Sequence, residues 1–205
     1  LQGNIEQSLK FDPRRYVRTL ETYATLANET QARLIVFPET AVPRFLDTVD
    51  PRYIEFLDGV ARRNNGDMLL GVPTRKSADE FYNSVLTLGV SPRQLYHKVH
   101  LVPYGEYLPL RAVLPAAIGE LVPGDLDAGT AADVLSMQSP PVKLGVLICF
   151  EDTLGDLTRK FVQNGAQVLV ASPAATEGKS ALLVTDSTGG NPKTLAEYNS
   201  DQNIA

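Results

Sequence analysis

Apolar residues recur along the chain in two ways, as short uninterrupted runs and as stripes at helical spacing. Uninterrupted runs are typical of strands buried on both faces, because such strands have no side that meets water. Four of these runs cover residues 34–37, 68–72, 142–148 and 167–170. Amphipathic stretches follow the first and third runs, one beginning at Asp50-Pro51 and one covering 153–164. The pattern predicts two strand–helix–strand units, with helices packed on sheet.

A further helix and a hairpin complete the predicted pattern. Asp12 and Pro13 have the sequence of an N-cap followed by proline at the first helical position, and apolar residues then recur at three- and four-residue spacing. This predicts a helix of roughly five turns. Residues 81–88 and 94–96, separated by Gly89 and a Ser-Pro pair, predict a hairpin and therefore a mixed sheet.

The character of the chain changes after Ala171. Residues 172–205 are rich in Ser, Thr, Asn, Asp and Gly and contain one apolar run, at 181–184. A segment of this composition buries too little apolar surface to offset the entropy lost on ordering. We therefore predict a folded domain over residues 1–171 and a poorly packed polar tail over 172–205.

Composition is that of an ordinary folded protein and excludes several functions. The 205 residues are 43% hydrophobic and 21% charged, close to globular averages. The net charge of −5 has the wrong sign for neutralising phosphates, so we expect no nucleic-acid partner. The longest apolar run is far short of the roughly 18 residues that span a bilayer. The chain begins with Leu1 and has no initiating methionine, so we expect a piece of a longer protein.

The single cysteine is the first candidate for chemistry. Cys149 directly follows the run at 142–148, at the carboxyl end of a predicted strand, where open α/β sheets bind ligands. A nucleophilic thiol fits that position, but residue type alone favours a packed core cysteine. One cysteine excludes an internal disulfide and a multi-cysteine zinc site. The spacing of His97, His100 and Glu106 matches no common zinc motif, so we expect no metal.

A nucleophilic thiol needs a group that accepts its proton and a cation that stabilises the oxyanion. His97 and His100 are the conventional partners of a cysteine. Glu39 follows the run at 34–37 and is a second candidate base, because a desolvated carboxylate becomes basic enough. Lys98 is the candidate cation. Taken singly, Glu39 and Lys98 would be solvated surface charges.

Three segments together carry a resemblance to a known family. They are Pro38-Glu39-Thr40, residues 96–109 and residues 148–152. In this order they resemble the glutamate, lysine and cysteine motifs of the carbon–nitrogen hydrolase (nitrilase) superfamily. Together with residues 2–5, they look most like its apolipoprotein N-acyltransferase branch. The resemblance runs from residue 1 to about residue 171 and implies an α/β fold, the nitrilase-like α-β-β-α sandwich.

The resemblance also implies a role for individual residues. It implies Glu39 as general base, Lys98 as oxyanion stabiliser and Cys149 as nucleophile. The residues that it implies as their supports are Glu106, Phe150 and Glu151. Of these, Glu106 would hold the lysine in place or help to move a proton.

A reaction, its partners and a location are implied in the same way. Cys149 would take a fatty acyl chain from a phospholipid as a thioester, without a cofactor. It would then pass the chain to the N-terminal amine of a diacylglyceryl-cysteine lipoprotein. Members of this branch carry transmembrane helices, which are missing from this sequence. The implied location is the bacterial inner membrane, with the catalytic domain on the periplasmic side and membrane contact through the missing helices.

Other interpretations remain open. A soluble amidase or nitrilase would use the same three residues on a small C–N substrate, and a non-catalytic remnant would bind lipid or a partner without turnover. The apolar segment 107–118 is either a lipid-contacting lid or a loop folded onto the core. We expect a sandwich that is incomplete at both ends, and a chain that does not complete acyl transfer by itself.

Overall fold

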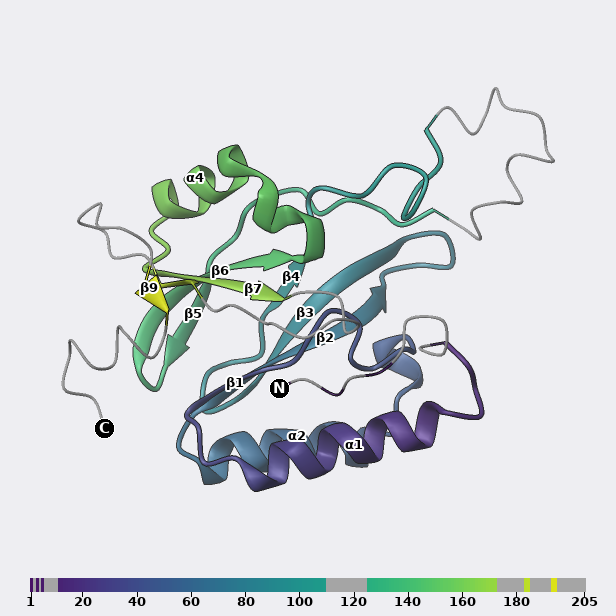
Figure 1. Ribbon diagram of the computed structural model, residues 1–205, viewed down its shortest axis with the longest axis vertical. Helices are drawn as coiled ribbons and strands as arrows, with labels where there is room; N and C mark the ends of the chain where they lie inside the picture. The colour runs from purple at the N-terminus through teal and green to yellow at the C-terminus, as the bar shows by residue number, and fades with distance from the viewer. Residues whose placement is uncertain are drawn as a thin grey trace.

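Two β-sheets lie face to face, and helices cover their outer sides (Figure 1). The computed structural model describes residues 1, 3, 5, 11–109 and 125–172, and the backbone of two short strands beyond them. The helices and strands, with two 3₁₀ helices written as η, are α1 (Tyr16–Glu29), β1 (Leu34–Val36), η2 (Leu46–Thr48), α2 (Pro51–Arg63), β2 (Asp67–Arg75), β3 (Phe81–Gly89), β4 (Leu95–His97), β5 (Leu135–Gln138), β6 (Pro141–Ile148), η4 (Cys149–Thr153), α4 (Gly155–Gln163), β7 (Val168–Ser172), β8 (Leu183–Val184) and β9 (Lys193–Thr194). The predicted α-β-β-α sandwich is confirmed.

The strand order places one parallel pair in each of the two facing sheets. The first sheet has the order β1-β2-β3-β4, in which only β1 and β2 are parallel. The second has the order β5-β6-β7, in which β6 and β7 are parallel. The predicted mixed sheet and hairpin are confirmed, whereas the sequence analysis missed β5. In that strand Leu135 and Met137 are buried and their neighbours exposed, a pattern of only four residues.

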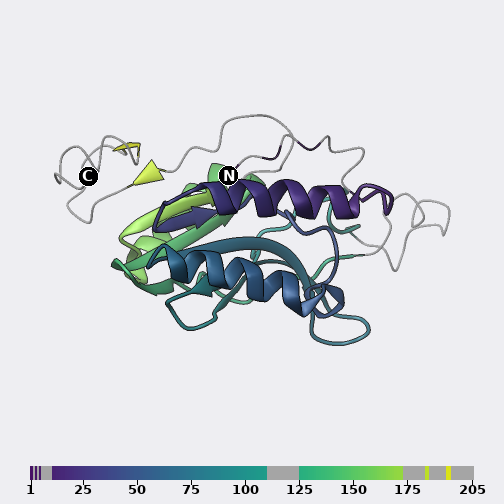
Figure 2. The same ribbon diagram turned by 90° about the horizontal axis from the view of Figure 1, so that it is seen from below.

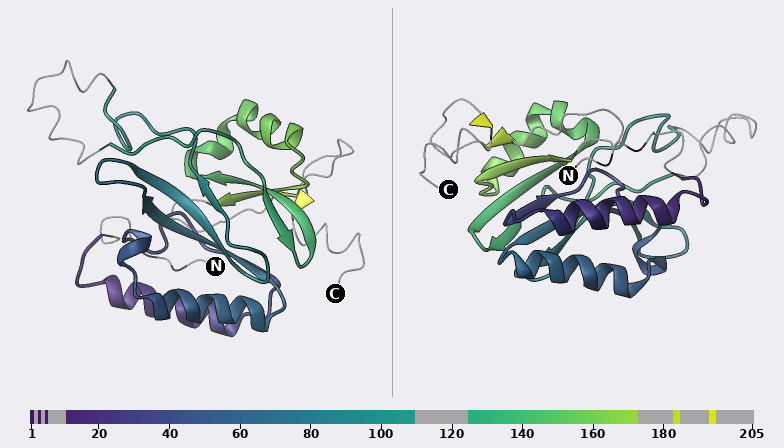
Figure 3. Two further views of the ribbon diagram at one scale, coloured as in Figure 1. Left: turned by 180° about the vertical axis from the view of Figure 1, so that it is seen from behind. Right: turned by 60° about the horizontal axis from the view of Figure 1, so that its bottom comes forward.

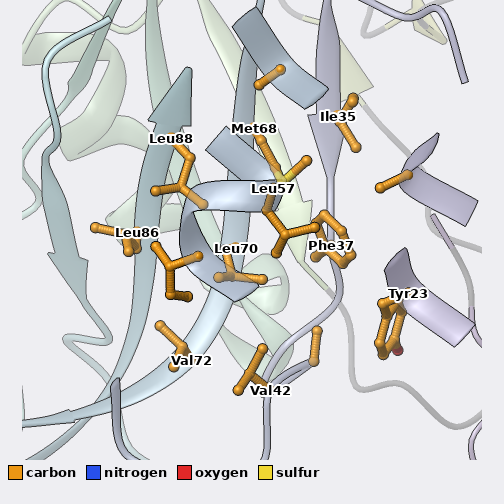
Figure 4. Packing of buried hydrophobic residues seen from close by; sticks show 14 of the residues in the cluster. Tyr23, Ile35, Phe37, Val42, Leu57, Met68, Leu70, Val72, Leu86 and Leu88 are labelled. Carbon is orange, nitrogen blue, oxygen red and sulfur yellow. The ribbon is translucent and has the colours of Figure 1, made fainter. Parts of the chain in front are cut away.

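Alternate residues of β2 face two different apolar layers. Met68, Leu70 and Val72 pack against α1 and α2 (Figure 4), and Leu69 packs toward the second sheet. This alternation follows from the two-residue period of a strand. The helices α1 and α2 lie side by side on one outer face (Figure 2), and α4 covers the opposite outer face (Figure 3). A strand between two such layers needs an uninterrupted apolar run.

The two predicted helix starts have different outcomes. Asp50 caps α2 as expected, because its carboxylate accepts the N–H of Arg52 at 3.0 Å. The predicted start at Asp12 is wrong, since α1 begins at Tyr16. Asp12 instead accepts hydrogen bonds from the N–H and the guanidinium of Arg14, in a turn that precedes the helix. The helix therefore has 14 residues, about four turns.

Ser172 ends β7 and does not begin a separate tail. It is buried, and its hydroxyl donates to the carbonyl of Phe37 at 3.1 Å. Beyond it, the structure describes only the antiparallel pair β8–β9. The rest of the predicted polar tail, and the segment 107–118 after residue 109, lie outside the described residues. Within the described part of the chain, no helix is long and apolar enough to cross a membrane.

Candidate active site

Three strand ends bring Glu39, Lys98 and Cys149 together. Glu39 follows β1, Lys98 follows β4, and Cys149 opens η4 at the end of β6. Lys98 Nζ lies 3.5 Å from Glu39 Oε1. The Cys149 thiol is close enough to Glu39 for a side-chain hydrogen bond, and it is close enough to Lys98 for the positive charge of the lysine to affect its pKa. The structure thus assembles the three residues that the sequence singled out.

The backbone around Glu39 is fixed by its neighbour β2. The segment from Pro38 to Thr40 crosses directly over Gly71, where an added Cβ would collide with the Pro38 carbonyl. Only glycine permits this close approach. The N–H of Val42 then bonds to the carbonyl of Gly71 at 3.2 Å. These contacts hold the buried Glu39 side chain at one place above the sheet.

Lys98 is fully buried between two carboxylates. Its side chain is 1% exposed, and Nζ donates to Glu106 Oε1 at 2.9 Å in addition to its pairing with Glu39. Its backbone N–H donates to the carbonyl of Asn83 on β3 at 2.8 Å. Burial lowers the pKa of Lys98, but the negative charges of Glu39 and Glu106 outweigh it, and the net shift is upward. Lys98 therefore remains an ammonium ion at neutral pH.

Glu106 reaches the site because the loop after Lys98 turns back on itself. The N–H groups of Gly105 and Glu106 both donate to the carbonyl of Val102. The Glu106 carboxylate in turn accepts the N–H of Val102 at 2.8 Å. One oxygen is thereby held by the backbone, and the other is aimed at Lys98. The sequence prediction that Glu106 lies at the site agrees with this placement.

Asn83 is a member of the site that sequence reasoning missed. Its Nδ2 donates to Oε1 of Glu39 and, at 3.2 Å, to Oε1 of Glu106, so that it bridges the two carboxylates. The signal was present in the sequence. Asn83 stands in a predicted strand on the same side as the buried Val85, and a buried amide must find partners.

Cys149 sits at a sharp turn between β6 and η4. Its φ angle is +52°, a left-handed conformation that non-glycine residues seldom adopt and that costs about 1–3 kcal/mol. Burial and the charge of Glu39 raise the pKa of the thiol, against the opposing effects of Lys98 and the Phe150 N–H, and the net shift is upward. The resting form is therefore the protonated thiol, which needs a base.

Glu151 holds two segments of the site together through hydrogen bonds. It is completely buried and accepts several hydrogen bonds of 2.7–3.1 Å. The donors are the Tyr96 hydroxyl and the backbone N–H groups of Val99, His100 and Ile148. The carboxylate thus ties the segment after Lys98 to the turn that carries Cys149. Phe150, the other predicted neighbour, is half-exposed beside the thiol.

The two histidines have different surroundings. His97 Nδ1 lies 2.7 Å from Ser84 Oγ, and its ring packs on Tyr82 with 4.4 Å between centroids. Burial lowers the pKa of His97. His100 is exposed, and its backbone N–H donates to Glu151. Glu39 is the candidate base whose charge acts on the thiol of Cys149.

A cavity of about 720 Å³ adjoins the site. Asn83 and Glu106 contribute to its wall, and apolar side chains line much of the rest, including Phe45, Phe81 and Leu126. A second cavity, of about 480 Å³, lies beside η2, α2 and β4 and is lined by none of the site residues.

Comparisons with known proteins agree with this arrangement. The family described as Carbon-nitrogen hydrolase matches residues 1–190. The chain belongs to the carbon-nitrogen hydrolase family. This confirms the resemblance seen in the three sequence segments, including its closeness to the N-acyltransferase branch.

Curated relatives within this family are named apolipoprotein N-acyltransferase. The one from Nitrosomonas europaea is 39% identical over 159 residues, which are 76% of this chain and 32% of the relative. The one from Methylococcus capsulatus is 36% identical over 173 residues, 82% of this chain and 34% of the relative. The carbon-nitrogen hydrolase chain thus spans about a third of the length of these relatives.

Solved structures of the same superfamily share the fold. A nitrilase-superfamily protein of Saccharomyces cerevisiae matches with a TM-score of 0.57 at 16% identity, over 77% of this chain and 59% of that chain. A carbon-nitrogen hydrolase from Helicobacter pylori matches with a TM-score of 0.55 at 15% identity, over 92% of this chain and 61% of that chain. At these identities the likeness concerns the fold alone.

Proposed function

We propose that this chain is the catalytic part of an enzyme that transfers a fatty acyl group from a phospholipid to the N-terminal amine of a diacylglyceryl-cysteine lipoprotein. The observation that carries the proposal is the cluster of Glu39, Lys98 and Cys149, in which a buried carboxylate and a buried ammonium meet one thiol. The names of the curated relatives support the same reaction.

The first half-reaction forms a thioester on Cys149. Glu39 accepts the thiol proton, and the sulfur attacks the carbonyl carbon of a phospholipid ester. The C–S bond forms and the C–O bond to the lysophospholipid breaks, while Glu39 returns the proton to the departing oxygen. Lys98 stabilises the negative charge that develops on the carbonyl oxygen, and it needs no reorganisation because Glu39 and Glu106 already hold it.

The second half-reaction passes the acyl group to an amine. The amine nitrogen attacks the thioester carbon, so that a C–N bond forms and the C–S bond breaks. Glu39 accepts the proton that the amine loses and returns one to the sulfur. In this step Glu106 acts through Lys98, which it keeps in position at 2.9 Å.

The cavity beside the site favours a lipid over a small amide. Its wall carries the apolar side chains of Phe45, Phe81 and Leu126 together with the polar side chains of Asn83 and Glu106. Burial of each methylene group there contributes about 0.8 kcal/mol to binding of an acyl chain. The location that goes with this proposed reaction, as the family resemblance implies, is the bacterial inner membrane, with this chain on the periplasmic side.

Product analysis distinguishes acyl transfer from hydrolysis. The purified full-length protein is incubated with phospholipid and a diacylglyceryl-cysteine peptide, and the products are followed by mass spectrometry. We expect N-acylated peptide and lysophospholipid to appear in equal amounts. A Phe56→Ala variant, altered at an exposed position on α2, serves as a control that should behave as wild type. Free fatty acid without acylated peptide, or turnover of small amides alone, would assign the site to a hydrolase.

A further inference from the structure

Asn83 contains a buried oxygen atom that has no partner among the described residues. The side chain is 6% exposed, and both carboxylates of the site are bonded to its Nδ2. Its Oδ1 accepts no hydrogen bond from any residue that the structure describes. A buried carbonyl oxygen without a donor is costly, and native proteins keep few of them. An atom of this kind at a reaction site calls for a donor that arrives with the substrate.

The orientation of the Asn83 amide follows from its neighbours. Ionised carboxylates only accept hydrogen bonds, so the face turned toward Glu39 and Glu106 must be the NH₂ group. A flipped amide would place Oδ1 against two negatively charged oxygens. The position of Oδ1 is thereby dictated by the same two residues that hold Lys98.

The Asn83 amide that carries Oδ1 contacts Glu39, the proposed general base. Asn83 Nδ2 bonds to Oε1 of Glu39, the same oxygen that pairs with Lys98. Oδ1 and Nδ2 share one carbon atom, so Oδ1 belongs to the same amide that bonds to the candidate base. Asn83 also lies in the wall of the 720 Å³ cavity. An acceptor amine that approaches Glu39 therefore also approaches the Asn83 amide.

We propose that Asn83 is a substrate-binding residue whose Oδ1 accepts a hydrogen bond from the acceptor amine, and that it selects a primary amine. The inference rests on the proposed function and assigns a group to its second half-reaction. A primary amine gives one proton to Glu39 as its nitrogen forms the C–N bond and the C–S bond breaks. Its other N–H stays bonded to Oδ1 and becomes the N–H of the amide product. The phospholipid ester has no N–H at its reacting carbonyl, so thioester formation does not use Oδ1.

The test compares two amines in two half-reactions of the full-length protein. Thioester formation on Cys149 is timed first, and the preformed thioester is then discharged to a lipopeptide with a primary amine or to its N-methyl analogue. The analogue retains one N–H for Glu39 and has none for Asn83. We expect Asn83→Ala to slow discharge to the primary amine about tenfold more than it slows thioester formation, and to abolish the preference for the primary amine. Asn28→Ala, an exposed asparagine on α1, is the matched control.

A purely structural role for Asn83 predicts a different result. If it only separates Glu39 from Glu106, Asn83→Ala slows both half-reactions equally and leaves the amine preference unchanged, which would overturn the inference. Where Asn83→Ala fails to fold, Asn83→Leu fills the same space without a charge and without an acceptor oxygen, and it should lose the preference for the primary amine. A preference that survives in Asn83→Leu also overturns the inference. A wild-type protein that forms no thioester refutes the proposed function itself.

Discussion

Glu39→Gln is expected to lower turnover by about 10²-fold or more while making the Cys149 thiol easier to ionise. The loss of turnover follows because glutamine cannot accept the thiol proton. The gain in acidity follows because the charge of Glu39 is one of the effects that raise the pKa of Cys149. A lower thiol pKa together with a lower rate is the signature of a missing base.

Lys98→Met is expected to reduce turnover on the same scale, because the oxyanion loses its cation. The effect on the thiol has the opposite sign. The positive charge of Lys98 lowers the pKa of Cys149, so its removal raises that pKa further. The opposite pKa shifts therefore distinguish the role of a base from that of a cation, although both variants have low turnover.

Both predictions are checked by the pH dependence of Cys149 alkylation with iodoacetamide. The midpoint of the profile should move to lower pH in Glu39→Gln and to higher pH in Lys98→Met. The exposed Glu55→Gln and Lys76→Met are matched controls and should leave both the midpoint and the turnover unchanged. Near-normal turnover in Glu39→Gln or Lys98→Met, or two midpoints that move in the same direction, would refute the assigned roles.

Glu151→Ala is expected to destabilise the fold by about 3–5 kcal/mol. The substitution leaves the Tyr96 hydroxyl and the Ile148 N–H buried without their acceptor, at about 1–3 kcal/mol each, and it removes the acceptor of the part-buried N–H groups of Val99 and His100. For a chain of this size the melting temperature should fall by roughly 10 °C. Asp152→Ala, at the exposed neighbouring position, should change stability by less than about 0.5 kcal/mol.

Thermal and urea unfolding of the two variants measure this difference. The account also predicts that thioester formation slows in Glu151→Ala, because the turn with Cys149 and the segment after Lys98 lose their common anchor. If Glu151→Ala and Asp152→Ala unfold alike, Glu151 does not hold these segments together.

Elements that depend on local pattern were predictable from the sequence. The run at 68–72 became part of β2 because a strand between two apolar layers has no polar face. Asp50 caps α2 because its side chain reaches the N–H of Arg52 within the same turn. Asp12 has the same local signal, but a turn held by Arg14 follows it, and the helix begins only at Tyr16.

The sequence predicted only those site residues that belong to its motifs. Strand ends made Glu39 and Cys149 candidates, and the family motifs added Lys98 and implied Glu39 as the base. The surroundings of the histidines, in contrast, depend on tertiary contacts. His97 bonds to Ser84 across two strands, which no local pattern reveals. Asn83 was missed although it stands in a predicted strand, because its two partners follow β1 and β4 and only the fold brings them together.

The central claim, that Cys149 carries the acyl group, is tested most directly by mass spectrometry of the full-length protein after incubation with phospholipid alone. Cys149 is the single cysteine of this chain, so a peptide that contains it reports the modification without ambiguity within these residues. The account predicts a fatty acyl adduct on that peptide, sensitive to hydroxylamine as thioesters are, and its absence from Cys149→Ala. An adduct that persists in Cys149→Ala, or that maps to another residue, would contradict the account.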